Sequence, residues 1–298
     1  MRIKFIQRII QAISAFVINS APDFFRTKVV YGGPEKNLCL PVLNCHACPT
    51  ARTTCPLGAI QTSLAYRQPG HIWFPLYPLG VLSLTSLLVG RAPCAWLCPF
   101  GFFQDLLSLI TGKKITIPQK LNYLRYLVLI ILVFILPYAL HGQWFTKFCP
   151  MGTLEGTIPW LSMSSLLPGI KPGYFIWIKL SILAFVVIMS ILTSRFFCRV
   201  LCPLGAILGI FNRLSLIRLK VESTCTKCGA CRKICPMDIS IYENDGSSDC
   251  IRCFRCTQCR HVSFAVGTKV IRKKSPPPES KNISGNNANR VEAADSKT

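Results

Sequence analysis

The stretch "RFFCRVLCPLG", residues 195–205, repeats the earlier stretch "RAPCAWLCPFG", residues 91–101. Both fit the pattern R-x2-C-x3-C-P-x-G, and each one directly follows a long apolar segment. With three residues between them, the two cysteines of a copy lie on the same side of a helical turn. The proline that follows ends a helix, and the glycine permits a sharp return of the chain. Each copy is therefore predicted to place two thiols where a helix stops at a membrane face.

The apolar segments beside these copies predict an integral membrane protein. The chain has 298 residues, 51% of them hydrophobic, and a mean hydropathy of +0.41. Crossing a bilayer takes ~20 apolar residues, and windows 68–90, 126–146 and 173–194 meet that need. The last window carries one charge, Lys179, close enough to one end to reach the interface. Residues 3–20 are the predicted first span, with a cleaved signal peptide as the alternative.

The distribution of charge argues for a membrane and against nucleic acid. The formal net charge is +22, but the basic residues lie in loops between long uncharged segments and form no continuous face. Loop 91–125 holds five Lys/Arg residues and loop 147–172 holds two. Because cytoplasmic loops carry the excess of positive charge, we expect a multi-pass protein of the inner (cytoplasmic) membrane with both termini inside. No nucleic-acid partner is expected.

The C-terminal part of the chain predicts two iron–sulfur clusters. The run "CTKCGACRKICP" at 225–236 has the spacing C-x2-C-x2-C-x3-C-P of bacterial ferredoxins, and a second run, "CIRCFRCTQC", fills 250–259. In two-cluster ferredoxins the fourth cysteine of each run ligates the other cluster. One [4Fe–4S] cluster is therefore assigned to Cys225, Cys228, Cys231 and Cys259, and the other to Cys250, Cys253, Cys256 and Cys235. A zinc site, the alternative for C-x2-C pairs, does not explain four cysteines followed by proline.

The predicted fold is an all-α integral membrane protein with about four transmembrane helices and a C-terminal two-cluster ferredoxin-like α+β domain. Its expected parts are a first helix or signal peptide (1–20), an extracytoplasmic cysteine-rich loop (21–70), a membrane domain with three further helices and both C-x3-C-P motifs (71–220), a ferredoxin-like domain (221–268) and a disordered tail (269–298). The fourth part, with its two cysteine runs, is called the ferredoxin cassette below.

Nine cysteines outside the cassette are candidate redox thiols or ligands of a further iron–sulfur or metal site. The inner thiols, on the predicted cytoplasmic side, form one four-thiolate site or two dithiols: Cys94, Cys98, Cys198 and Cys202. The outer thiols lie on the predicted exported side: Cys39, Cys45, Cys48, Cys55 and Cys149. Export favours disulfides, so two bridges are one interpretation of the outer thiols. The pattern C-P-x-G, which recurs on both sides, favours a redox site instead.

Two histidines at the outer ends of predicted spans are candidates for a quinone site. His71 and His141 could bracket a quinone headgroup and accept its protons near neutral pH. A bis-histidine haem and a merely interfacial position are the alternatives for the same pair.

Together these motifs resemble a known family. Four spans, paired C-x3-C-P motifs and a double ferredoxin cassette are similar to NapH-type membrane ferredoxins, relatives of MauN and of the membrane half of NosR. The resemblance covers roughly residues 70–265. It implies an electron-transfer subunit of a quinol-oxidising membrane complex, with its clusters at the cytoplasmic face. It does not extend to the outer "CHACPTARTTCPLG" loop.

The expected function is therefore membrane-bound iron–sulfur electron transfer, with quinone as substrate and ferredoxin-like or cytochrome subunits as partners. The alternative is a thiol- or copper-handling assembly factor similar to CcoG, because soft thiolates select Cu(I). A channel or transporter is disfavoured, since the predicted spans hold no acidic residue.

Overall fold

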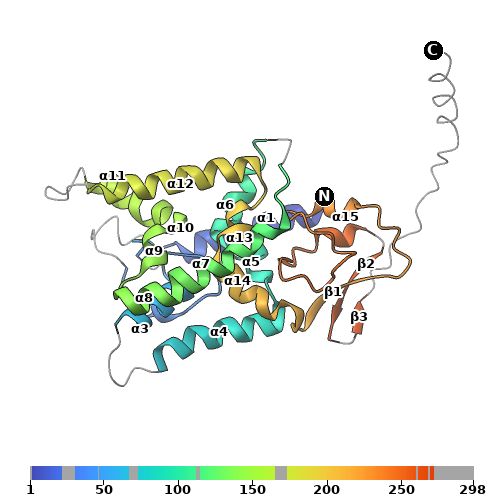
Figure 1. Ribbon diagram of the computed structural model, residues 1–298, viewed down its shortest axis with the longest axis horizontal. Coiled ribbons are helices and arrows are strands. Elements are labelled where there is room, and N and C mark those ends of the chain that lie inside the picture. Colours follow the sequence, from blue (N-terminus) through green and yellow to red (C-terminus); the bar gives the residue numbers. More distant parts are fainter. Residues whose placement is uncertain are drawn as a thin grey trace, which may run out of the picture.

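The computed structural model describes residues 2–21, 31–45, 47–66, 73–111, 115–164, 173–259, 261–267 and 269–271. His71 and most of the predicted tail, residues 272–298, lie outside them. The described chain forms a helical body with a small sheet at one end (Figure 1).

The elements of the helical body are α1 (Arg2–Ile18), η1 (Pro34–Asn37), α3 (Pro56–Ala65), α4 (Trp73–Val89), α5 (Ala92–Trp96), α6 (Pro99–Leu107), η2 (Gln119–Tyr123), α7 (Leu124–Val128), η3 (Leu129–Ile135), α8 (Leu136–Leu140), α9 (Trp144–Phe148), α10 (Pro150–Gly152), η4 (Thr153–Thr157), α11 (Ile158–Ser164), α12 (Phe175–Leu192), α13 (Phe196–Val200), α14 (Pro203–Ile210) and η5 (Phe211–Arg213). The cassette end holds β1 (Ile217–Val221), α15 (Ala230–Ile234), η6 (Arg255–Gln258), β2 (Val262–Val266) and β3 (Lys269–Ile271).

A helix lies over each of the four segments that were expected to span a membrane. Among the described residues, Gln119–Leu140 and Phe175–Leu192 are long and apolar enough to cross one, and Pro75–Val89 is a shorter apolar helix. At 1.5 Å per residue, the first of these is about 33 Å long, close to the ~30 Å hydrocarbon core. The first predicted span coincides with α1, which is 17 residues long.

The third predicted span was wrong at both ends. It was expected over 126–146 because Arg125 bounds the uncharged window, but the helix begins at Gln119 and ends at Leu140. Arg125 lies inside the helix, 1% exposed, and pairs with Asp249 of the cassette. A paired charge is tolerated where an unpaired one is not, so the arginine does not end the helix. His141 adopts a left-handed conformation and ends it instead.

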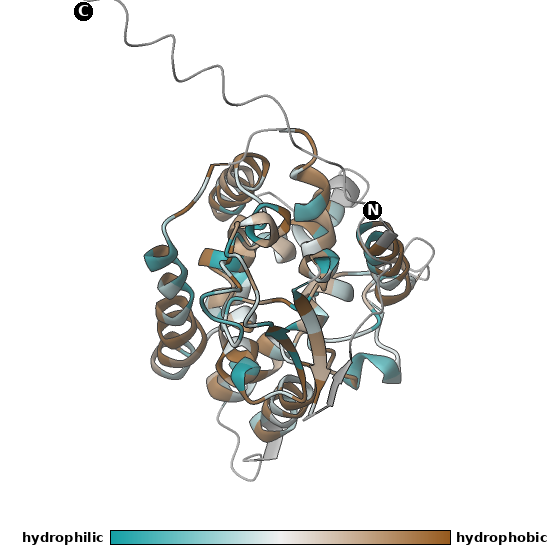
Figure 2. Cartoon of the chain, turned by 90° about the vertical axis from the view of Figure 1, so that its right-hand side faces the viewer, coloured by the Kyte–Doolittle hydropathy of each residue, from teal (hydrophilic) through white to brown (hydrophobic). Residues whose placement is uncertain are grey.

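Apolar side chains cover the outside of the helical body. Phe5, Ile13 and Phe16 of α1 are each more than half exposed, as are Phe185 and Ile188 of α12. Figure 2, which looks onto the cassette end, shows hydrophobic residues on the helices around the rim. Large exposed apolar surfaces are uncommon on a soluble monomer, and this one accompanies the two helices that are long and apolar enough to cross a membrane.

A three-stranded sheet flanks the cassette, and its strands extend beyond the predicted boundaries of the domain. β2 pairs antiparallel with both β1 and β3, so that Ile217 lies opposite Val266 and Phe264 lies opposite Ile271. The ordered domain therefore begins at Ile217 rather than at 221, and β3 lies within the segment that was predicted to be a disordered tail.

Candidate iron–sulfur sites

The structure brings the second cysteine run together with the last cysteine of the first. Burial, followed by the neighbouring thiolates of Cys250, Cys253 and Cys235, raises the pKa of Cys256. Cys235 itself is followed by proline and has an extended backbone at the end of α15. Cys235 therefore lies near the three cysteines of the second run, and their binding of one shared cluster stays a prediction.

Of the other four cassette cysteines, three are at least partly exposed and Cys231 is buried. Burial and the thiolates of Cys259 and Cys225 raise the pKa of Cys231, so these three lie together. Cys228 is exposed on the same loop. This group is therefore the more exposed of the two.

The four inner thiols are buried together where the two sequence copies meet. Each is 4–6% exposed. Burial and the thiolates of Cys198, Cys94 and Cys98 raise the pKa of Cys202, and burial followed by Cys198 and Cys94 raises that of Cys98 to about 12. The two pairs therefore face one another and form one four-thiol group.

The second cysteine of each copy caps the helix that follows it. Cys98 precedes α6 and Cys202 precedes α14, both with extended backbones. The amide N–H of Gly101 donates to Cys98 Sγ and that of Gly205 donates to Cys202 Sγ, each at 3.4 Å. Backbone donors of this kind stabilise a thiolate. In the C-P-x-G pattern, proline begins the helix and the third residue after cysteine supplies the donor.

An arginine from each copy reaches into the other copy. Arg91 Nη2 donates to the Cys198 carbonyl at 3.2 Å, and Arg195 Nη1 donates to the Cys94 carbonyl at 2.8 Å. Both arginines are fully buried. A Cβ on Gly205 would lie 2.5 Å from Arg91 Nη2. Gly205 thus leaves room for the arginine that holds Cys198, whereas a Cβ on Gly101 would lie 2.8 Å from the Cys94 carbonyl.

A buried carboxylate neutralises one of these arginines and joins the cassette to the body. Asp105 accepts from Arg195 Nε and Nη2 at 2.8 Å each, and from Arg255 Nη2 of the cassette at 3.2 Å. Burial alone would raise the pKa of Asp105, but the two arginines outweigh it and lower the pKa below its ordinary value. Arg255 Nε also donates to Gln7 of α1 at 2.9 Å, so the cassette is docked on two helices.

The inner thiols and one cassette group share a single packed core. Cys253 lies in the same buried cluster as Cys94, Cys98 and Cys202. The thiolates of Cys198 and Cys253 both raise the pKa of Arg195, after the larger effects of burial, which lowers it, and of Asp105. Arg195 therefore lies beside both thiol groups. Trp96 Nε1 donates to the Arg252 carbonyl at 3.1 Å across the same interface.

The outer thiols gather at the end of the body opposite the cassette. Cys45, Cys55 and Cys149 line one small cavity, and all five outer thiols are buried. The structure forms no disulfide among the cysteines it describes. Glu155 lies beside them, accepting from the Cys45 amide at 3.2 Å and from Asn19 Nδ2 at 2.9 Å, and burial raises its pKa to about 8.

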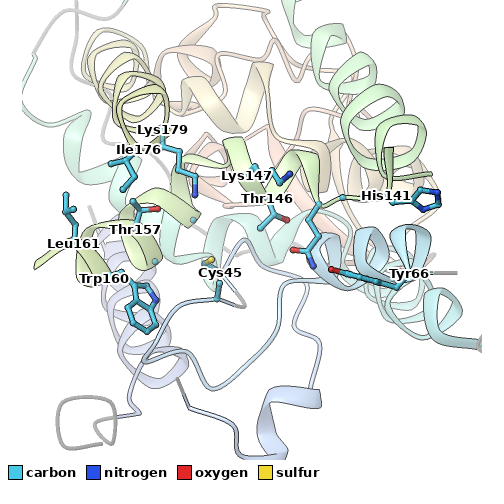
Figure 3. Close-up of a pocket in the computed structure, with 15 residues that line it drawn as sticks. Cys45, Tyr66, His141, Thr146, Lys147, Thr157, Trp160, Leu161, Ile176 and Lys179 are labelled. Carbon is cyan, nitrogen blue, oxygen red and sulfur yellow. The ribbon is translucent and has the colours of Figure 1, made fainter. Parts of the chain in front are cut away.

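One of the two candidate histidines lines a large pocket next to the outer thiols. The pocket, about 680 Å³, is lined by Cys45, His141, Lys147, Trp160 and Lys179, among others. His141 stands at its far edge with its ring directed away from Cys45 (Figure 3), and its Nδ1 is 3.0 Å from the Ala65 carbonyl. The pocket therefore combines aromatic walls with cationic groups beside a thiol.

The donor sets fit iron–sulfur clusters better than a single ion. Within the part of the chain that the structure describes, no three His, Cys, Asp or Glu side chains converge closely enough to hold one metal ion. A [4Fe–4S] cube binds each thiolate through a different iron, so its ligands stand farther apart. The inner thiols, which are buried and accept from the amides of Gly101 and Gly205, suit such a cluster by their donor chemistry.

Two residues of the inner site were not found from the sequence. Gln104 and Asp105 lie outside the R-x2-C-x3-C-P-x-G pattern, whereas each of the two arginines is the first residue of a copy. Gln104 Nε2 donates to Cys198 Sγ at 3.1 Å, and Gln104 Oε1 accepts from the Phe197 amide at 3.1 Å. The available signal was the pair of polar residues, Gln104 and Asp105, inside an otherwise apolar helix.

A family model described as a 4Fe-4S binding domain matches the chain twice, at residues 71–118 and 175–222. Each match contains one complete C-x3-C-P pair. The two matches lie in the helical body and not over the cassette runs, which places the family signal on the inner thiols.

Three relatives match more than half of this chain. The uncharacterized protein MJ0750 of Methanocaldococcus jannaschii is 34% identical over 236 residues, covering 74% of this chain and 90% of that protein. The ferredoxin-type protein NapH of Escherichia coli is 27% identical, covering 74% and 76%. The methylamine utilization ferredoxin-type protein MauN of Methylorubrum extorquens is 30% identical, covering 60% and 59%.

No solved structure matches the chain. The names of these relatives describe ferredoxin-type proteins, which does not favour the copper-handling alternative.

Proposed function

Because the chain belongs to the family of NapH-, MauN- and NosR-type ferredoxin-like iron–sulfur proteins, we propose that it is the electron-transfer subunit of a membrane redox complex of the quinol dehydrogenase type. Its clusters exchange electrons between a quinone in the bilayer and further redox subunits.

The cassette residues hold the two clusters of the proposal. Bound [4Fe–4S] clusters supply one-electron transfer. The ligands are Cys225, Cys228, Cys231 and Cys259 for the exposed site, and Cys235, Cys250, Cys253 and Cys256 for the site that faces the helical body. The exposed position of Cys228 suits contact with a soluble redox partner.

One observation carries the proposal: Arg195 lies beside both the cassette thiol Cys253 and the inner thiol Cys198. Arg195 is held in this position by its buried ion pair with Asp105. A rigid, dry connection of this kind is what fast electron transfer between two sites needs, and a brace for the fold alone would not require thiols on both sides of it.

The inner thiols are proposed to hold a third cluster. Each copy contributes two cysteines, so neither copy alone supplies the four thiolates of a cube. The two matches to a 4Fe-4S binding domain, one on each copy, support this assignment. Gln104 and the amides of Gly101 and Gly205 donate to the thiolates and tune the site.

The pocket at His141 is the proposed quinone site. Its walls include the apolar and aromatic side chains of Trp160, Leu161 and Ile176, which suit a flat ring. His141 at its edge can exchange the protons that accompany quinone reduction and oxidation. The lipid-facing apolar surface of α12 gives a route from the bilayer.

The test is reduction of the clusters by a quinol. The full chain, purified in detergent without oxygen, should show [4Fe–4S] signals by electron paramagnetic resonance after dithionite and after duroquinol. A His141→Ala variant should slow the duroquinol reaction at least about tenfold and leave the dithionite reaction unchanged. The matched control is His261→Ala in the cassette, a half-buried residue that hydrogen-bonds Thr224.

Equal duroquinol rates in both variants would overturn the quinone site. The absence of cluster signals after dithionite would overturn the electron-transfer function itself.

A further inference from the structure

We propose that the outer thiols form a further [4Fe–4S] site, ligated by Cys45, Cys48, Cys55 and Cys149. This site deepens the proposed electron-transfer function and rests on it, because it places a carrier at the end of the molecule that the cassette does not reach.

Three of the ligands surround one small cavity. Cys45, Cys55 and Cys149 line it from three segments that are far apart in the sequence, together with the apolar side chains of Leu57 and Phe145. A set of structural disulfides would pair these thiols two by two. Three thiols around one cavity are instead arranged to bind one shared cluster.

Two of these cysteines have the same local backbone as the inner thiols. Cys55 and Cys149 have φ/ψ of −70°/127° and −66°/122°, and Cys98 and Cys202 have −69°/119° and −75°/109°. The amide three residues later donates to the cysteine sulfur in the inner pair, whereas no side-chain hydrogen bond caps the helix at either outer cysteine. The chain therefore repeats the same extended cysteine backbone before a proline four times, twice in the inner group and twice in the outer one.

An unpartnered polar side chain is aimed at the same cavity. Asn44 lines it and is 2% exposed. Neither atom of its side-chain amide finds a hydrogen-bond partner among the described residues. Leaving such a group unsatisfied in the interior costs about 1–3 kcal/mol, whereas the sulfur atoms of a bound cluster would accept from its N–H groups.

Cys48 is the fourth ligand because it belongs to the same local unit as Cys45. The Cys48 amide donates to the Cys45 carbonyl at 3.1 Å, and both residues pack with Ala51 in a small separate core. Cys39 bridges to Thr54 through its backbone and is not among the residues that line the cavity. The remaining outer cysteine therefore serves as a natural control.

A single dipeptide connects this site with the inner thiols. Leu43 lies in the same buried cluster as Cys98, and the next residue, Asn44, lines the small cavity beside Cys55. The cassette, the inner thiols and the outer thiols thus form a series of neighbouring sites along the body.

The outer site also reaches the pocket. Cys45 lines both the small cavity and the large pocket that contains Lys147 and Lys179 (Figure 3). A thiolate-ligated cluster carries net negative charge, because each cysteine gives up its proton on binding. Lys36 supplies a compensating positive charge on the loop itself. Burial lowers its pKa, and the thiolates of Cys48 and Cys45 partly oppose that shift.

The test counts iron in the full chain, purified in detergent without oxygen. Relative to the wild type, Cys149→Ala, Cys55→Ala, Cys45→Ala and Cys48→Ala should each lose about four irons and about four sulfides per chain. One paramagnetic signal should disappear, and the cassette signals should remain. Cys39→Ala, the matched control from the same loop, should keep the wild-type iron content.

Asn44→Ala keeps every ligand and guards against variants that fail to fold. It should retain all iron and shift the midpoint potential of that same signal. Unchanged iron in Cys149→Ala, or a disulfide between two outer cysteines in the anaerobic protein, would overturn the outer site while leaving the proposed function intact. Loss of the cassette signals in the wild type would instead refute the proposed function.

Discussion

Arg91 and Arg195 hold each other's cysteines: the side chain of each donates to the backbone carbonyl of the first cysteine in the copy to which the other belongs, at 3.2 and 2.8 Å. Neither copy of the R-x2-C-x3-C-P-x-G pattern is therefore complete by itself. These contacts explain why each copy of the pattern begins with arginine. The close approach of Arg91 explains the glycine at position 205, because a larger residue there would displace that side chain.

Removing one arginine should destabilise the protein strongly. In Arg195→Met the carboxylate of Asp105 keeps only Arg255 as its ionic partner in the interior, and a buried pair broken on one side costs about 3–5 kcal/mol. We expect a lower unfolding temperature and a lower yield. Arg232→Met removes an exposed ion pair with Asp238 and should change stability by about 1 kcal/mol or less. Similar losses in the two variants would contradict the clamp.

A single methyl group at Gly205 should disturb the inner site. Its Cβ would lie 2.5 Å from Arg91 Nη2 in a fully packed region, so Gly205→Ala should cost about 1–3 kcal/mol and lower the iron content of the inner site. Gly80→Ala is the matched change, since nothing lies within 4 Å of the position of its Cβ. Normal iron in Gly205→Ala would show that the arginine can move aside freely.

The contribution of Asp105 to stability should depend on pH. Its pKa is lowered in the folded protein from an ordinary value of 3.8, so in acid the unfolded chain binds the proton more readily. The stabilisation is therefore complete above pH 3.8 and is lost as the pH falls further. The difference in unfolding free energy between wild type and Asp105→Asn should shrink in denaturant titrations below about pH 4. A difference that stays constant in acid would argue against a charged Asp105.

Gln104 should tune the potential of the inner site without holding its iron. Its Nε2 donates to Cys198 Sγ at 3.1 Å, and hydrogen bonds to ligand sulfurs help to set cluster potentials. Gln104→Met should shift the midpoint of the inner signal to a more negative value at unchanged iron content. Gln143→Met, at the opposite end beside Thr62, should leave that midpoint in place. Loss of iron in Gln104→Met would mean that the side chain is structural.

The outer pocket and the C-terminal end of the chain should lie on opposite sides of the membrane. A reporter that is active only outside the cytoplasm should be active when fused after Gly142 and silent when fused after Thr298. This follows from the helix Gln119–Leu140, which begins beside Asp249 of the cassette and ends beside the outer pocket. Activity of the fusion after Thr298 would reverse the predicted orientation.

Local spacing was a good guide to this molecule wherever the chemistry is local. The order of cysteines in the cassette predicts which thiols share a cluster, because two or three intervening residues leave little choice of geometry. In the structure Cys235 is a neighbour of these three cysteines of the second run, and their ligation of one cluster stays a prediction. Uncharged windows likewise predict where the long helices lie, since lipid excludes unpaired charge.

Contacts between distant segments could not be predicted in this way. The charge of Arg125 predicts the end of an apolar span. Its partner Asp249, 124 positions away in the chain, neutralises that charge and allows the helix to continue. The loop that holds the outer thiols was expected to stand apart from the inner ones, and no pattern indicated that Leu43 lies in the same buried cluster as Cys98. Which residue neutralises or caps another depends on packing, which the sequence pattern does not record.

The exchanged arginines have a consequence for the ancestry of the fold. Reciprocal contacts, in which one patch binds a second copy of itself, are the mark of an isologous interface between identical subunits. Here both halves belong to one chain, as expected if a gene for a half-length protein was duplicated and fused. Such a half-length ancestor would have carried one arginine and two cysteines, and would have completed its four-thiol site only as a homodimer. Present-day chains with a single copy of the pattern should therefore dimerise through it.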